Sequence, residues 1–134
     1  MSIDNRFNAS ICFLKKQLPD FSYNEIKKIV EEVLNLCGMY REIFAENSMA
    51  EVPIIGEIDG KIISAKIDRL VLSDNKVIIV DYKTNRPSAK TIDDVPSQYI
   101  NQMKYYKLLM ERIYPNKIIE TYLLWTNTCN MMKI

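Results

Sequence analysis

Three acidic residues fall where a β-sheet would bring them side by side. Asp59-Gly60 is a typical two-residue hairpin turn, and a hairpin closed there places Glu51 opposite Asp68. A second two-residue turn at residues 74–75 then places Asp68 opposite Asp81. The Cβ atoms of directly opposed residues lie roughly 4.5–5.5 Å apart on one face of a sheet. The sequence therefore predicts one row of carboxylates, Glu51, Asp68 and Asp81, across three adjacent strands.

A row of like charges needs a chemical reason, because opposed carboxylates in a sheet destabilise each other. Either the carboxyl pKa values are raised or a cation lies among them, and Mg²⁺ or Mn²⁺ prefers such oxygen ligands. Lys83 follows Asp81 by two residues, so it lies on the same face of the strand. The alternative is a set of solvated surface charges, since a single β-bulge would break the row. Two independent turns that align three acids favour a metal site with an adjacent lysine.

The composition removes several other kinds of site. The chain contains no histidine, which excludes Ser-His and Cys-His catalysis and histidine-based zinc sites. Its three cysteines, Cys12, Cys37 and Cys129, are too few and too scattered for a four-thiolate zinc or iron–sulfur site. The 18 Lys and Arg residues nearly balance the 17 Asp and Glu residues, so nucleic-acid binding must use a local patch.

Hydrophobic periodicity predicts the elements that must position these residues. Apolar residues at helical spacing follow the capping-box sequence Ser22–Glu25 and continue to Gly38, with a short helix after them. From residue 51 the period changes to that of strands, and Pro53 suits an edge strand. The predicted strands span residues 51–58, 61–72, 76–82, 117–126 and 131–134, and the predicted helix between them spans 96–113.

This order of elements predicts one domain over residues 1–134, with a helical N-terminal part at 1–46 and a core at 49–134. The core begins with a three-strand antiparallel meander and continues with a helix and a strand. The longest aliphatic run, residues 77–80, is far too short for a membrane span. An odd cysteine count without a signal segment indicates a cytoplasmic protein, and we expect no membrane partner.

Three segments together resemble the C-terminal nuclease domain of the AddA and RecB helicase–nucleases, in the PD-(D/E)xK superfamily. They are Ile67-Asp68-Arg69-Leu70, Ile79–Arg86 and the helical pattern Tyr99-x-x-Gln102-x-x-x-Tyr106. Further similarity to the AddA of alphaproteobacteria lies in Ala50–Ile54, Ile113–Pro115 and Leu123–Thr126, so the resemblance runs from about Ala9 to the end. It implies a restriction-endonuclease-like α/β fold with a central mixed sheet flanked by helices.

The resemblance implies a role for each matching position. Asp68 and Asp81 match the metal-ligand carboxylates, and the main-chain carbonyl of Tyr82 supplies a further oxygen. Lys83 matches the lysine that activates the attacking water and stabilises charge on the phosphate. Glu51 matches an acidic position that assists the site. The implied cofactor is Mg²⁺ or Mn²⁺.

Further positions are expected to contact the lysine or the substrate. Gln102 and Tyr106 match a helix whose Gln and Tyr orient the lysine or contact DNA, and residues four apart share a helix face. For Tyr106, plain core packing is an equal alternative. Arg69, Arg86 and Lys90 lie near the site in sequence and could contact phosphate oxygens. The alternative for each is a solvated surface charge, and this alternative is favoured for Lys90.

The chain departs from the family pattern at two positions. The family carries a metal-binding histidine in an N-terminal helix, and residues 12–19 fit that helix with Cys12 in the histidine's place. A thiol prefers softer metals than Mg²⁺, so this ligand is altered or lost. Ala65 stands where the family usually has a glycine. If the alignment holds, Cys12 points toward the two aspartates from a helix near the chain start.

The resemblance implies a Mg²⁺- or Mn²⁺-dependent DNA exonuclease domain that acts in double-strand break repair and recombination. Its partners would be DNA and a helicase subunit or an AddB-like protein. Two other interpretations stay open. The chain could be a catalytically impaired remnant that binds DNA or docks a protein, which the loss of the histidine favours. It could also be a nuclease for another nucleic acid or junction structure, because the motif sets the chemistry alone.

Overall fold

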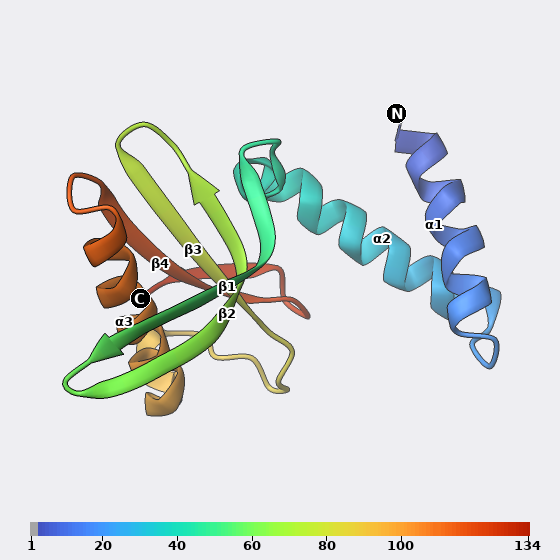
Figure 1. The fold of residues 1–134 in the computed structure, drawn as a ribbon. Helices are drawn as coiled ribbons and strands as arrows, with labels where there is room; N and C mark the ends of the chain where they lie inside the picture. The colour runs from blue at the N-terminus through green and yellow to red at the C-terminus, as the bar shows by residue number, and fades with distance from the viewer. Residues whose placement is uncertain (1–2) are drawn as a thin grey trace. The chain divides into compact units, whose positions relative to one another are not determined.

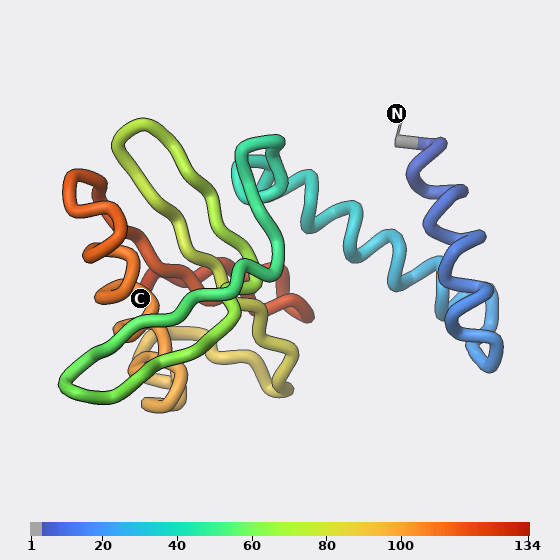
Figure 2. Tube along the Cα trace, viewed as in Figure 1, coloured from blue at the N-terminus to red at the C-terminus, as the bar shows by residue number. Residues whose placement is uncertain are grey.

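The computed structural model describes residues 3–134, and side chains from Asp4 onward. These residues form two compact units, and the boundary between them lies between Arg41 and Glu42. Figure 1 shows the helices and strands of each unit, and Figure 2 traces the same chain as a tube. The candidate site lies in the second unit.

The first unit consists of two helices, α1 (Ile3–Gln17) and α2 (Tyr23–Met39). As predicted, α2 begins after Ser22, whose hydroxyl accepts the Glu25 N–H at 3.2 Å. The Glu25 carboxylate in turn accepts the Ser22 N–H at 2.7 Å. This capping box satisfies two N–H groups that the first helical turn leaves without partners. The two helices share a small apolar core formed by Ile11, Ile26 and Val30.

The second unit is a five-stranded mixed sheet with one long helix. Its strands lie in chain order, β1 (Ser48–Ile58), β2 (Lys61–Leu72), β3 (Lys76–Lys83), β4 (Ile118–Trp125) and β5 (Asn130–Lys133). Only the β3–β4 pair is parallel, and the helix α3 (Ser97–Ile113) lies in the connection between these two strands. Two short 3₁₀ helices are also present: η1 (Arg41–Phe44) begins at the unit boundary, and η2 (Ile92–Asp94) precedes α3. The predicted α/β fold, with an antiparallel meander inside a mixed sheet, is confirmed.

The predicted strand register is also present. Ile58 pairs with Lys61 across the Asp59-Gly60 turn, and the same register continues to the pair Ser48–Val71 at the other end of β1. Between β2 and β3, Arg69 pairs with Val80, so the next position toward the site brings Asp68 level with Asp81. β1 is an edge strand of the sheet, as Pro53 indicates.

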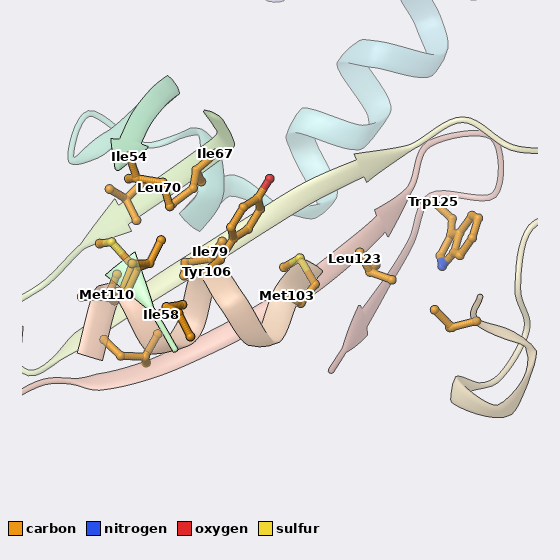
Figure 3. Packing of buried hydrophobic residues seen from close by; sticks show 14 of the residues in the cluster. Ile54, Ile58, Ile67, Leu70, Ile79, Met103, Tyr106, Met110, Leu123 and Trp125 are labelled. Carbon is orange, nitrogen blue, oxygen red and sulfur yellow. The ribbon is translucent and has the colours of Figure 1, made fainter. Parts of the chain in front are cut away.

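The main core lies between α3 and one face of the sheet. Figure 3 shows Met103, Tyr106 and Met110 of α3 among apolar side chains of the strands, including Ile79 and Leu123. Gly56 of β1 has no room for a side chain, because a Cβ atom there would collide with Leu109 of α3. Within residues 3–134, no helix is both long and apolar enough to cross a membrane.

Candidate active site

Asp81 and Lys83 form the centre of the candidate site at the end of β3. Asp81 is 5% exposed, and its Oδ2 lies 2.6 Å from the Lys83 Nζ. Burial raises the pKa of the Asp81 carboxyl above its ordinary value, and the Asp68 charge acts in the same direction. The hydrogen bond and charge of Lys83 oppose that rise. A buried carboxylate with an ammonium partner is the arrangement expected where negative charge must be held out of water.

Asp68 stands beside Asp81 on the neighbouring strand, as the turn sequences predict. Its Oδ2 accepts the main-chain N–H of Tyr82 at 2.8 Å, which fixes the carboxylate against β3. Its side chain also lies within hydrogen-bonding reach of the Asp81 carboxyl. The Tyr82 main-chain N–H is therefore part of the site, and the Tyr82 carbonyl, which belongs to the following peptide group, stays a predicted ligand.

Lys83 is held by α3 as well as by Asp81. Its Nζ donates to Gln102 Oε1 at 3.3 Å and lies 3.9 Å from the centre of the Tyr99 ring. Asn85 Nδ2 donates to the Tyr99 hydroxyl at 2.7 Å, so Tyr99 contacts Lys83 with its ring face and Asn85 with its hydroxyl. Tyr99 and Asn85 were absent from the predicted site residues. The spacing of Tyr99, one helical turn before Gln102, was the signal that could have suggested it.

Gln102 and Tyr106 lie one turn apart on α3 and contact each other. Gln102 Nε2 donates to the Tyr106 hydroxyl at 2.9 Å, which fixes the amide with its oxygen toward Lys83. Tyr106 is 4% exposed, and burial followed by the Asp81 charge raises the pKa of its hydroxyl above the ordinary value. Figure 3 shows this hydroxyl directed away from the neighbouring methionine side chains. The ring of Tyr106 packs in the core and its hydroxyl accepts a hydrogen bond from Gln102, while its role toward the lysine or DNA stays a prediction.

Glu51 does not join the aspartates, and the predicted row of three carboxylates is wrong at this position. Glu51 has a φ of 52°, and no strand pair forms between it and Asp68 although the register continues on either side. The left-handed conformation interrupts the alternation of the strand at Glu51. The Glu51 side chain is 75% exposed, and its Oε1 lies 3.7 Å from Lys66 Nζ.

The three predicted phosphate-contacting residues have different surroundings. The Arg69 guanidinium donates to the Ile43 carbonyl and to the Ser48 hydroxyl, both at 2.7 Å. It also lies 5.2 Å from the centre of the Phe44 ring, so its contacts connect β2 to η1. Arg86 and Lys90 are exposed in the connection between β3 and η2.

Cys12 is an exposed residue of α1, in the first unit. Its predicted approach to the two aspartates stays a prediction. Across residues 3–134, no three His, Cys, Asp or Glu side chains are grouped as metal ligands. Asp68 and Asp81 nevertheless provide two adjacent hard oxygen groups, which fit a divalent cation that keeps several waters.

Comparisons with known proteins identify the family and the fold of this chain. A sequence profile of the PD-(D/E)XK nuclease superfamily matches residues 8–127. The chain belongs to this superfamily. PD-(D/E)XK nucleases generally use divalent metal ions such as Mg²⁺. Asp81 and Lys83, with one residue between them, have the spacing of the D-x-K part of that motif, and their catalytic roles stay predictions.

A solved structure shows the same fold. The crystal structure of a proposed exonuclease from Eubacterium rectale superposes with a TM-score of 0.55 at 17% sequence identity. That match covers 98% of this chain and 56% of the other chain. The protein SSO0001 gives a TM-score of 0.47 at 17% identity, over 92% of this chain and 60% of the other. This chain therefore spans little more than half the length of these two structures. No curated protein matches the sequence.

Proposed function

We propose that this chain is a Mg²⁺- or Mn²⁺-dependent DNA nuclease domain of the AddA/RecB type. It would act as an exonuclease in double-strand break repair and recombination in the cytoplasm. The observation that carries this proposal is the 2.6 Å contact between Lys83 and Asp81, with Asp68 adjacent. A helicase subunit or an AddB-like protein is the expected partner, because a single domain with a net charge of +1 has little general attraction for DNA.

The side chains divide the chemistry among them. Asp68 and Asp81 would hold the divalent ion, which polarises the scissile phosphate and lowers the pKa of a bound water. Lys83 places a positive charge next to the two carboxylates, where it offsets negative charge that develops on the phosphate. Gln102 accepts a hydrogen bond from Lys83 and so directs its ammonium group, and Tyr106 fixes the Gln102 amide.

Cleavage of linear DNA tests the proposed function directly. The wild-type chain with Mn²⁺ at low salt should release acid-soluble nucleotides, and Asp81→Ala should abolish the release because it removes a ligand. Asp74→Ala is the matched control, since Asp74 is an exposed acid in the turn between β2 and β3. If wild type and Asp81→Ala release equal amounts under Mn²⁺, the proposed function is rejected.

Lys83→Ala separates the role of the lysine from that of the aspartates. We expect this change to abolish cleavage while Mn²⁺ binding persists, because the ammonium acts on the phosphate and not on the ion. Calorimetric titration with Mn²⁺ measures the binding, and nucleotide release measures the turnover. A Lys83→Ala protein that keeps wild-type turnover would contradict this role.

The competing function is a DNA-binding or protein-docking module without turnover. Two points favour it. Among the described residues, 3–134, no third carboxylate joins Asp68 and Asp81, and the resemblance aligns Cys12 with the family's histidine. Cys12→His should raise Mn²⁺ affinity by about the 10–100-fold that a supporting ligand contributes, and turnover should rise with it. If Mn²⁺ gives no binding heat with wild type or with Cys12→His, the non-catalytic function is the better one.

A further inference from the structure

A second concave surface adjoins the candidate site. It is a groove of about 390 Å³ between β2 and α3, within the ~300–1,000 Å³ range of small-molecule sites. Ile63 and Ala65 of β2 line one side, and Gln98, Asn101 and Tyr105 of α3 line the other. None of these five residues contributes to the metal or lysine chemistry described above.

The groove is continuous with the catalytic residues. Gln102 and Tyr106 line it as well, and Gln102 accepts the hydrogen bond from Lys83 at 3.3 Å. Any group that occupies the groove therefore lies next to the side chains that orient the lysine. A substrate phosphate at Lys83 would have a neighbouring nucleotide within reach of the groove.

The chemistry of the lining fits a nucleobase. Ile63 and Ala65 provide an apolar side, and Tyr105 is 41% exposed, so its ring is accessible for stacking. The accessible lining is mostly apolar, so the flat face of a base would make most of the contact, and the amides of Gln98 and Asn101 offer donors and acceptors to its polar edge. A phosphate group would find no charged side chain among the lining residues.

We propose that this groove holds one unpaired base of the substrate strand, beside the phosphate that is cleaved, with Tyr105 as the stacking residue. The inference rests on the proposed nuclease function and names its substrate as an unpaired strand. A base inside a duplex is stacked on both sides and paired along its edge, so it can enter such a groove only after leaving the helix.

Substitution of Tyr105 tests the stacking contact. Tyr105→Ala should lower kcat/KM on a single-stranded oligothymidylate by about 5- to 150-fold, the loss expected for one stacked base. Tyr105→Phe keeps the ring and should stay near wild type. Leu108→Ala is the matched control, because Leu108 is an exposed residue of the same helix that does not line the groove. Equal activity of Tyr105→Ala and wild type would overturn the proposal.

A strand with one missing base gives the complementary test. An abasic residue at one fixed distance from the cleaved bond should reduce kcat/KM for wild type by the same factor as Tyr105→Ala. The same strand should cause no further loss in Tyr105→Ala, because the contact is already absent. If the kcat/KM losses from the abasic strand and from Tyr105→Ala multiply, or if an abasic residue has no effect at any position, base binding in the groove is overturned. The proposed nuclease function would be unaffected by either result.

Binding without cleavage separates this inference from the proposed function. The Lys83→Ala protein can be titrated with fluorescent oligothymidylate and compared with the double variant Lys83→Ala/Tyr105→Ala. Weaker binding of the double variant supports the groove even if the wild type shows no turnover, in which case the nuclease function alone fails. Equal binding by the two proteins overturns the groove.

Discussion

Lys83 shows how much of this site depends on the surroundings of a single residue. A lysine is a point charge on a flexible stem, so it acts on one phosphate oxygen only if its direction is fixed. Asp81, Gln102 and the ring of Tyr99 fix it here from three directions. The sequence could indicate Asp81 and Gln102, because their spacing follows strand and helix periods. The spacing of Tyr99 places it one turn before Gln102, but an aromatic residue at such a position predicts core packing equally well, so its contact with Lys83 could not be predicted.

Tyr99 can be tested by keeping or removing its ring. Tyr99→Leu should lower kcat by about 2- to 30-fold, the equivalent of a cation–π contact of roughly 0.5–2 kcal/mol. Tyr99→Phe should retain most of the activity because it loses only the hydrogen bond from Asn85. Steady-state kinetics at saturating oligonucleotide measure both variants. A change confined to KM in Tyr99→Leu would show that the ring does not orient Lys83.

At the scale of elements, two turns fix the strand register of the candidate site, and β1 departs from the predicted strand pattern at Glu51. Asp59-Gly60 and the turn at residues 74–75 predicted the register that brings Asp68 level with Asp81. The left-handed conformation of Glu51 could not be predicted, because glutamate carries no preference for it. A single residue in the left-handed region leaves no mark in a strand's alternation pattern, so the interruption of β1 was not predictable.

Close contact between β1 and α3 makes Gly56 intolerant of a side chain, whereas Gly38 has open space around it. Gly56→Ala would collide with Leu109, so we expect a loss of about 1–3 kcal/mol in unfolding free energy. Gly38→Ala is the matched comparison, because Gly38 lies within α2 and its Cβ would meet no atom within 4 Å. That change should stabilise the helix by up to about 1 kcal/mol. Urea unfolding measures both, and equal midpoints for the two variants would contradict the packing described for β1.

The Glu120 carboxylate of β4 contacts side chains from both neighbouring strands, β3 and β5. The Tyr122 hydroxyl donates to Glu120 Oε2 at 2.8 Å, and Lys76 and Lys133 lie within 3.7 Å and 3.4 Å of the same carboxylate group. Burial, and then Glu120, raises the pKa of Tyr122 from 10.0 to about 12. The folded state therefore holds the Tyr122 hydroxyl proton more tightly than the unfolded state does. The resulting stabilisation of the fold is complete below pH 10.

That stabilisation should disappear as the pH rises from about 10 toward 12. Chemical unfolding across this range should show a steeper loss of stability for wild type than for Tyr122→Phe, which has no proton to release. Tyr105→Phe removes an exposed tyrosine and serves as the control. Parallel pH profiles for wild type and Tyr122→Phe would show that the Tyr122–Glu120 bond contributes nothing.

At the scale of the molecule, the two compact units differ in the size of their cores. The helical unit buries three residues in its cluster, whereas the sheet unit buries fifteen around α3. Since stability within a protein follows buried apolar contacts, the two units should open with different free energies. The sequence predicted the helices and the sheet of these units from their periods, but periodicity carries no information on how strongly separate units are coupled.

Hydrogen exchange can measure this difference on the complete chain. Amides of α1 and α2 should exchange well before those of β3 and β4, because the small helical core protects them less. Mass spectrometry of peptides from each unit, at several exchange times, gives the comparison. A single common protection factor for all helices and strands would show that the chain opens as one cooperative unit.

Trp125 is a built-in fluorescent probe of the candidate site. It is the chain's only tryptophan, it is 2% exposed, and its ring lies 6.4 Å from that of Tyr99, centre to centre. The fluorescence of an indole depends on the charges and rings around it. Any event that moves the Lys83 ammonium on the Tyr99 face should therefore change the emission of this one fluorophore. Rapid mixing with a metal ion or an oligonucleotide would then time arrival at the site, without a label and separately from bond cleavage.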